Sequence, residues 1–322
     1  MNLDYSSYRD IPNLVVLHAG YRLVDTAALY RNEKSVGEAI RDSGIPREDV
    51  WVTTKLWDSL RLSMFGQCGY EQTLKACGQS VQQLGDLAAW TLGFLGTGYI
   101  DLYLQLGRRF REVKGGHVDF CNFRIHSPNT GKLVETWDAM IELQRRGLVK
   151  SIGVSRLHRI PMVGVPTVSP MLRDAEHWRN FGVPHLEALR DSGRQMPVVN
   201  QIVTGLQRFR FCAAHGIKIT AYGSIFSGQQ EQLARKEVAS VLAAHPSKTA
   251  AQVLLRWGLQ MDFQVIPKSV RQERLQENMN LMDFELTPSE MEVLSAMRGA
   301  LHEYWNPLKS KVDLGRTDRG QA

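Results

Sequence analysis

Short apolar runs alternate with helical patterns of about ten residues or more along most of this 322-residue chain. The runs are bounded by turn residues and have the length of buried strands. Strands that alternate with helices pair in parallel, so the pattern predicts an α/β protein built from repeated strand and helix units. Seven strands are expected, at residues 23–27, 50–56, 99–104, 149–155, 198–202, 217–222 and 264–269.

Helix boundary signals occur between and after these strands. Asn32 and Glu33 open a segment with one apolar face, and Gly44 ends it as a C-terminal glycine does. Farther along, Thr287 and Glu290 have the spacing of a capping box. The regular alternation is typical of a closed barrel or of an open, doubly wound sheet.

The glycine pattern favours the barrel. A doubly wound dinucleotide domain carries G-x-G-x-x-G directly after its first strand, whereas the glycine cluster of this chain, Gly93 to Gly98, precedes a strand. The G-x-x-x-x-G-K-[ST] loop of nucleoside triphosphatases does not occur. The chain length suits one barrel domain over residues 1–322.

Composition argues against several partners. The net charge of +6 is spread along the chain without a dense basic block, so nucleic acid is not an expected partner. The four cysteines show neither CxxC spacing nor paired histidines, which argues against a metal site and a disulfide framework. No signal-peptide pattern opens the chain, and a cytoplasmic location is expected. The apolar stretch at residues 87–104 contains three glycines and Asp101, so no membrane span is expected.

Four polar residues lie at or after the C-terminal ends of predicted strands, where barrel enzymes place their catalytic groups. Asp25 ends the first strand, Tyr30 lies five residues later, Lys55 ends the second strand and His126 follows the third. One reaction that such a set of residues suits is hydride delivery to a carbonyl carbon. This reaction leaves negative charge on the carbonyl oxygen, which needs a proton donor. A tyrosine hydroxyl, with an unperturbed pKa of about 10, becomes a useful acid near a cation. Lys55 would supply that cation, Asp25 would hold the lysine and His126 would orient the carbonyl. Taken singly, such residues are more often a helix cap, a packing side chain and a structural histidine.

A long block joins three of these residues. The segments GYRLVDTAALYRNEKSVGEAI and SGIPREDVWVTTKLW resemble the block of aldo-keto reductases that carries Asp, Tyr and Lys at this spacing. Further matches are YIDLYL, IHSPNTGKLVETWDAMIELQRRGLVKSIGVS, PVVNQI and VIPKSVRQERLQENMNLMDFELT, and together they span about residues 19–286. The resemblance implies a (β/α)8 TIM barrel, with Tyr30 as the general acid in the reduction of an aldehyde or ketone.

The resemblance also implies the cofactor NADPH. In the family, the segment that matches residues 268–278 holds the adenosine phosphate end, and arginine suits a phosphate through its planar donor fork. The residues that would bind NADPH are Ser155, Asn180 and Gln201 at the carboxamide, Tyr222 stacked on the nicotinamide, and Lys268, Ser269, Arg274, Glu277 and Asn278 at the adenosine phosphate. Without the resemblance, residues 268–278 read as an ordinary solvated helix face. The family further suggests a monomer that acts on a small carbonyl substrate.

The chain departs from the family pattern at several places. Blocks near residues 60–68, 86–96, 105–124 and 156–179 look inserted, and removal of the last three restores family spacing. We hypothesise that they are translated non-coding sequence or poorly ordered loops. The first family strand has no counterpart before residue 19, so the barrel is expected to be incomplete. The segment after Gln201 is also shorter than the full helix of the family.

These departures leave a second interpretation open. The third block lies directly before His126 and the fourth separates Ser155 from Asn180. The chain is then either an active NADPH-dependent carbonyl reductase or a cofactor-binding barrel without turnover that acts as a sensor or interaction module. A third possibility, a chain that does not fold stably, follows from the missing strand and the sheet edges it would expose.

Overall fold

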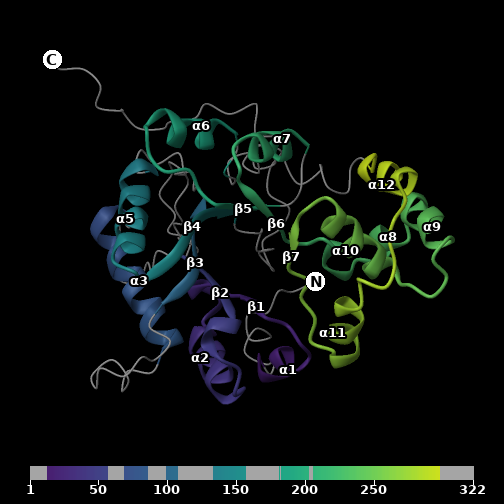
Figure 1. Ribbon diagram of the computed structural model, residues 1–322, viewed down its shortest axis with the longest axis horizontal. Helices are drawn as coiled ribbons and strands as arrows, with labels where there is room; N and C mark the ends of the chain where they lie inside the picture. The colour runs from purple at the N-terminus through teal and green to yellow at the C-terminus, as the bar shows by residue number, and fades with distance from the viewer. Residues whose placement is uncertain are drawn as a thin grey trace, which may run out of the picture.

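A seven-stranded parallel sheet forms the centre of the protein, and helices surround it (Figure 1). The computed structural model describes residues 13–56, 69–85, 99–107, 133–156, 181, 183–202 and 206–297. The sheet order follows the chain, β1-β2-β3-β4-β5-β6-β7, as successive strand–helix units require. The strands are β1 (Leu23–Asp25), β2 (Trp51–Lys55), β3 (Ile100–Gly107), β4 (Val149–Arg156), β5 (Val199–Ile202), β6 (Lys218–Ala221) and β7 (Gln264–Val265).

Helices connect and cover these strands. The α-helices are α1 (Asn13–His18), α2 (Glu33–Asp42), α3 (Tyr70–Leu84), α5 (Leu133–Arg145), α6 (Val183–Asp191), α7 (Leu206–Ala214), α8 (Gln230–Leu233), α9 (Lys236–Leu242), α10 (Ala250–Gln260), α11 (Gln272–Met279) and α12 (Pro288–Ser295). The described residues also form three single-turn 3-10 helices, η2 (Ala28–Tyr30), η3 (Arg47–Asp49) and η5 (Phe226–Gly228). Among the described helices, none is long and apolar enough to cross a membrane.

All seven predicted strands are present, which confirms the α/β parallel architecture. The last prediction is wrong in length, because β7 ends at Val265 rather than at residue 269. Only Gln264 and Val265 pair with β6, and Pro267 shortly after them has no backbone N–H to donate to a ladder. β3 and β4 run to Gly107 and Arg156, and therefore reach into the blocks that start at residues 105 and 156.

Two helix predictions have clear outcomes. Thr287 and Glu290 form the predicted capping box, with Pro288 in the first turn of α12. After Gln201, where the sequence looked too short for a full helix, the chain forms the nine-residue helix α7. The remaining parts of the four inserted blocks lie outside the described residues.

The sheet curls strongly across its width. Asp25 on β1 and Gln201 on β5 are separated by three strands, yet Gln201 Nε2 donates to Asp25 Oδ2 at 2.7 Å. In a flat sheet, strands four positions apart lie about 19 Å from each other. The hydrogen bond therefore requires the curvature of a barrel, and the sheet is a half-barrel consistent with the TIM-barrel fold.

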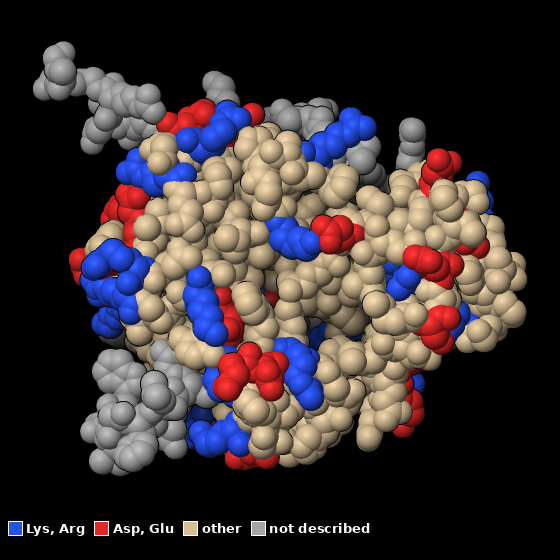
Figure 2. All heavy atoms as spheres, viewed as in Figure 1, with Lys and Arg blue, Asp and Glu red and all other residues tan. Residues whose placement is uncertain are grey.

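β1 and β7 are the two edges of the sheet in the part of the chain that the structure describes. An open hollow of about 390 Å³ lies between the starts of these strands, lined by Arg22, Leu23, Glu48, Asp49, Trp51 and Gln264. The face in Figure 2 is hollowed near its centre, and its basic and acidic side chains are interspersed. The eighth strand of a complete barrel would lie between these two edge strands.

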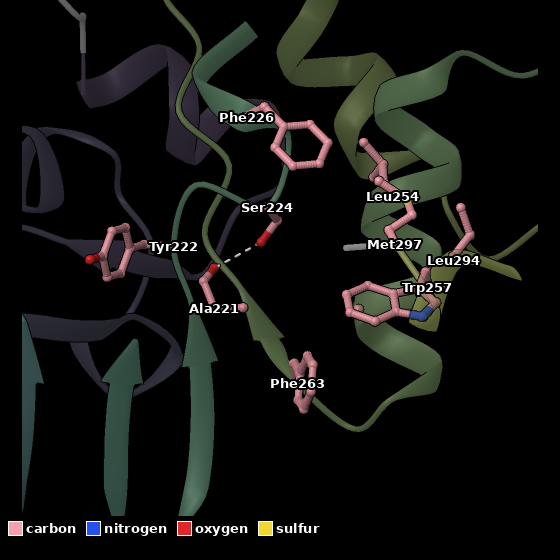
Figure 3. Close-up of a pocket in the computed structure, with 10 residues that line it drawn as sticks. Ala221, Tyr222, Ser224, Phe226, Leu254, Trp257, Phe263, Leu294 and Met297 are labelled. Atoms are coloured by element: carbon pink, nitrogen blue, oxygen red, sulfur yellow. Dashed lines mark hydrogen bonds between the residues drawn. The ribbon is translucent and has the colours of Figure 1, made fainter. Parts of the chain in front are cut away.

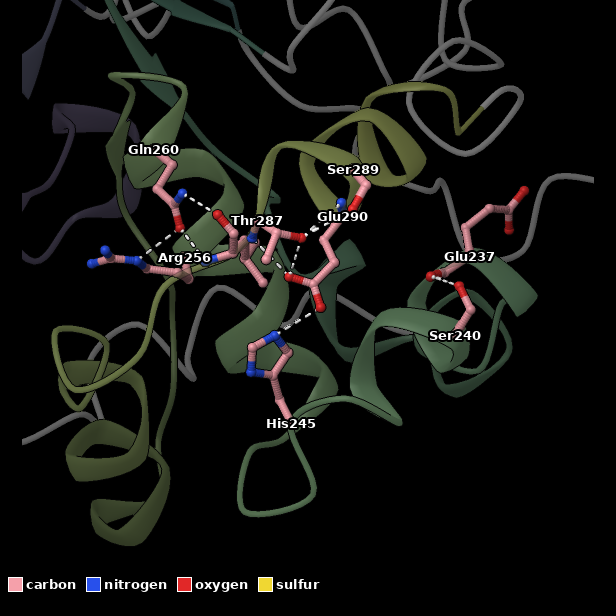
Figure 4. Close-up of polar contacts among 9 residues, drawn as sticks. Glu237, Ser240, His245, Arg256, Gln260, Thr287, Ser289 and Glu290 are labelled. Atoms are coloured by element: carbon pink, nitrogen blue, oxygen red, sulfur yellow. Dashed lines mark hydrogen bonds and ion pairs between the residues drawn. The ribbon is translucent and has the colours of Figure 1, made fainter.

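The apolar core lies mainly between the sheet and helices α1 to α7. Trp137 and Tyr103, both fully buried, are among its largest side chains. A second apolar cluster joins α9, α10 and α12, which lie together beyond β7 (Figure 1). Polar contacts close this region, including the hydrogen bonds of Gln260 and Glu290 (Figure 4). Within the curled sheet, Leu102, Leu104 and Val199 form a small interior cluster.

Candidate active site

A lysine and an aspartate form a buried ion pair at the C-terminal ends of β1 and β2. Lys55 Nζ donates to Asp25 Oδ1 at 2.5 Å and to the Thr26 carbonyl at 2.9 Å. The Lys55 side chain is 1% exposed and that of Asp25 is 14% exposed. Because side chains alternate along a strand, the last residues of these two parallel strands point into the curled sheet together. A buried ammonium is stable here because it is both paired and hydrogen-bonded.

Tyr30 lies above this pair. It ends the 3-10 helix that follows β1, and the centre of its ring is 5.2 Å from Lys55 Nζ. At this distance the lysine charge interacts with the aromatic ring. The structure therefore brings together three of the four residues predicted for catalysis.

Ser155 and Gln201 continue the polar group across the interior. They are register partners on β4 and β5, and Ser155 Oγ donates to Gln201 Oε1 at 3.0 Å. Through Gln201 Nε2 the chain of hydrogen bonds reaches Asp25. Ser155 and Gln201 are nearly fully buried, at 0% and 3% exposed. Two of the residues predicted to bind the nicotinamide carboxamide thus lie directly beside the predicted catalytic pair.

Tyr222 directly follows β6. Its ring points away from Phe226, Leu254 and Trp257, which surround a small apolar cavity on the other side (Figure 3). That cavity is about 10 Å³, room for about one water molecule. It is too small for a cofactor ring, and a stacking role for Tyr222 has to use the side away from it.

The segment after β7 carries the predicted adenosine phosphate residues. Arg274 is exposed on α11, and Asn278 on the same helix is 5% exposed. Glu277 accepts a hydrogen bond from the Thr249 hydroxyl at 2.6 Å, and Ser269 Oγ accepts the Arg271 N–H at 3.1 Å. Partial burial lowers the pKa of Lys268, and a phosphate beside it would raise that pKa again. The donors of this segment have the chemistry of an anion site.

His126 and Asn180 lie outside the described residues, and their places in the site stay predictions. The sequence stretches directly before them, in the third and fourth inserted blocks, lie largely outside as well.

Sequence reasoning assigned no site role to several polar residues that surround the ion pair. Thr26 Oγ1 donates to Asn32 Oδ1, and Thr54 Oγ1 donates to Glu33 Oε1, both at 2.6 Å and both buried. The sequence offers one indication that Thr26 and Thr54 belong to the site, because they are direct neighbours of Asp25 and Lys55 in the chain. The sequence around Asn32 and Glu33 indicates only the start of a helix.

Burial sets the ionisation of the groups behind β2. Desolvation raises the pKa of the Glu33 carboxyl, although hydrogen bonds from Thr54 and Ser80 and the charge of Lys55 act in the opposite direction. Burial, with a smaller contribution from Glu33, raises the pKa of the Cys77 thiol to about 12. Cys77 is therefore a packing residue rather than a nucleophile at neutral pH.

Comparison with known proteins assigns this arrangement to a family. The model of the aldo/keto reductase family matches residues 3–298, which is most of the chain. The chain belongs to the aldo/keto reductase family. It is therefore an oxidoreductase of a family that reduces carbonyl compounds.

Characterised relatives and solved structures agree with this assignment. The chain is 36% identical over 280 residues to a 9,11-endoperoxide prostaglandin H2 reductase of Trypanosoma cruzi, covering 85% of this chain and 77% of that protein. It is 32% identical over 283 residues to a glyoxal reductase of Bacillus subtilis, covering 86% and 79%. The crystal structure of a Bombyx mori aldo-keto reductase in complex with NADP matches with a TM-score of 0.64 at 26% identity, covering 94% of this chain and 84% of that one.

Proposed function

We propose that this aldo/keto reductase transfers hydride from NADPH to an aldehyde or ketone, with Tyr30 as the proton donor. The observation that carries the proposal is the buried pair of Lys55 and Asp25 directly beneath the Tyr30 ring. A structural ion pair has no need of a tyrosine beside it, whereas carbonyl reduction needs a proton donor and a nearby cation.

Each residue has a defined task in this reaction. NADPH, when bound, would supply the hydride that becomes the new C–H bond at the carbonyl carbon, and would leave as NADP+. The Tyr30 hydroxyl gives its proton to the carbonyl oxygen, and the product is an alcohol. Lys55 favours the tyrosinate that remains, because opposite charges at short range stabilise one another. Asp25 holds the lysine in place. The orienting role of His126 stays a prediction from the sequence.

The residues predicted to bind NADPH divide into a nicotinamide group and an adenosine phosphate group. Ser155 and Gln201 would bind the carboxamide, with Asn180 from outside the described residues, and Tyr222 would stack on the ring. Lys268 and Arg274 would meet the 2′-phosphate, with Ser269, Glu277 and Asn278 at the same adenosine phosphate end. Support comes from the partial burial of Lys268, the exposure of Arg274 and the relative that was solved with NADP. We infer a single barrel domain that acts as a monomer in the cytoplasm on a small carbonyl substrate.

The test is turnover of NADPH with a reactive aromatic aldehyde, followed by the loss of nicotinamide absorbance. Wild-type protein is expected to turn over, and Tyr30→Phe is expected to lose most of the rate, since general acid catalysis typically contributes a factor of about 100 or more. Tyr99→Phe is the matched control, because Tyr99 directly precedes β3, at the opposite end of the strands, between Arg47 and Lys150. Unchanged turnover in Tyr30→Phe would remove the mechanism. Tight NADPH binding without any turnover in the wild type would refute the enzymatic function and favour a cofactor-binding barrel that acts as a sensor.

A further inference from the structure

The loop that carries Tyr30 is short and is attached at both ends to the catalytic strands. It leaves β1 at Asp25, passes through a single 3-10 turn to Tyr30 and enters α2 at Glu33. Any rotation of this loop changes the distance between the Tyr30 hydroxyl and Lys55. What fixes the loop therefore also fixes the catalytic geometry.

The first attachment runs through Thr26. Its hydroxyl donates to Asn32 Oδ1 at 2.6 Å, and its carbonyl accepts from Lys55 Nζ at 2.9 Å. Its N–H donates to the Thr53 carbonyl of β2 at 2.8 Å. Thr26 is fully buried and Asn32 is 7% exposed. One residue thus connects the lysine on one side to the far end of the tyrosine loop on the other.

The second attachment runs through Thr54, the residue before Lys55. Its hydroxyl donates to Glu33 Oε1 at 2.6 Å, and Ser80 of α3 also hydrogen-bonds the Glu33 carboxyl. Thr54 is fully buried and Glu33 is 6% exposed. Because neighbours on a strand point to opposite faces, Thr54 holds the loop from behind the sheet while Lys55 faces the interior.

The backbone between Tyr30 and these attachments is in an unfavourable conformation. Arg31 has a φ of 55°, in the left-handed region that residues other than glycine and asparagine rarely adopt. Such a conformation persists only when the surrounding structure determines it. The hydrogen bonds at Asn32 and Glu33, directly after Arg31, are the contacts placed to do so.

We propose that Asn32 and Glu33 are positioning residues, and that their buried hydrogen bonds from Thr26 and Thr54 set the place of Tyr30 over Lys55. This inference rests on the proposed function, because it concerns the distance from the proton donor to its cation. A displacement of about 1 Å in a reacting group can lower a rate about 100-fold. Loss of either bond is expected to lower kcat while the affinity for NADPH stays unchanged, since neither bond involves the predicted cofactor residues.

Isosteric substitutions at the two threonines give a sharp test. Thr26→Val and Thr54→Val each remove one hydroxyl and keep the side-chain shape. Thr73→Val is the matched control, because the fully buried Thr73 hydroxyl donates to the Gly69 carbonyl at 2.7 Å at the start of α3. Thr26→Ser and Thr54→Ser keep the hydroxyl and serve as rescue variants. Each protein is measured for kcat and KM with NADPH and an aromatic aldehyde, for NADPH affinity by fluorescence titration, and for its melting temperature.

We expect kcat to fall about tenfold or more in Thr26→Val and Thr54→Val, with unchanged NADPH affinity, and to return toward the wild-type value in the serine variants. Thr73→Val is expected to keep kcat even where its melting temperature falls by a similar amount. Equal kcat in all three valine variants would overturn the inference. If a valine variant does not fold, Asn32→Ala against Asn32→Asp makes the same comparison, because aspartate keeps the acceptor oxygen.

The same set of assays distinguishes failure of this inference from failure of the proposed function. Wild type and Tyr30→Phe are assayed beside the threonine variants. An inactive wild type, or a fully active Tyr30→Phe, refutes the proposed function and this inference with it. An active wild type and an impaired Tyr30→Phe, together with wild-type kcat in Thr26→Val and Thr54→Val, refutes this inference alone.

Discussion

Removal of the Lys55 ammonium tests the energetic role of the ion pair directly. In Lys55→Met the side chain keeps most of its length and loses the charge that pairs with Asp25 Oδ1 at 2.5 Å. The Asp25 carboxylate then remains in the barrel interior with the Gln201 amide as a partner at 2.7 Å. The predicted loss of stability comes from this one change.

The size of the stability loss follows from burial. Breaking a buried pair by removing one partner costs about 3–5 kcal/mol, because the other charge stays behind without compensation. Asp25 is 14% exposed and keeps one hydrogen bond, so the lower end is expected, about 3 kcal/mol. For a chain of 322 residues that corresponds to a fall of roughly 4–5 °C in the melting temperature.

Guanidinium unfolding followed by tryptophan fluorescence measures the loss, with linear extrapolation to water. The double variant Asp25→Asn/Lys55→Met removes both charges and is expected to be at least about 1 kcal/mol more stable than the sum of the single variants predicts. A loss below about 1 kcal/mol in Lys55→Met is the behaviour of a surface pair. That result, or strict additivity in the double variant, would refute the buried-pair reasoning.

Two further predictions concern the scaffold. Gly37→Ala on α2 is expected to lower the free energy of unfolding by about 1–3 kcal/mol, because the new Cβ would lie 2.2 Å from the Leu84 carbonyl oxygen of α3. Gly78→Ala on α3 is the control and should be neutral or stabilising, because its new Cβ meets nothing within 4 Å. Equal melting temperatures for the two variants would contradict this prediction. Glu290→Gln tests α12 (Figure 4): partial burial opposes ionisation, but hydrogen bonds from the Thr287 N–H and hydroxyl and from His245 lower the pKa of Glu290 overall. The stability that the ionised Glu290 adds is therefore present above the unfolded pKa of glutamate, about 4.3, and is lost as the pH falls through the lower folded pKa. The difference in unfolding free energy between wild type and Glu290→Gln should then disappear in acid. A difference that is constant from pH 7 to pH 3 would contradict this prediction.

The strand pattern of this barrel is predictable because each strand is a local apolar run bounded by turn signals. Asp25 and Lys55 were also predictable as a pair, since the ends of neighbouring parallel strands meet at one edge of the sheet. The hydrogen bond from Gln201 to Asp25 was not, because it depends on how far the sheet curls. Curvature is a property of all the strands together, and no single segment encodes it.

Other features escaped prediction for similar reasons. Asn32 and Glu33 have the sequence of a helix start, and nothing local indicates that Thr26 and Thr54 use them as acceptors. β7 looked six residues long from its apolar content, yet only Gln264 and Val265 form register pairs with β6, and Ile266 adds a single N–H bond to the Ala221 carbonyl. Helix α7 forms in a segment that looked shorter than the full helix of the family, because Phe209, Phe211 and Cys212 pack against the main core. In each case contacts with other parts of the chain decided the structure.

Hydride transfer itself is the most direct test of the account. NADPH carrying deuterium at one or the other face of nicotinamide C4 is incubated with the protein and an aromatic aldehyde, and the alcohol is analysed by mass spectrometry. The account predicts that the alcohol from one of the two labelled cofactors gains a single deuterium on the former carbonyl carbon, and that Tyr30→Phe slows its formation. Alcohol without deuterium from either cofactor, or no alcohol at all, would contradict it.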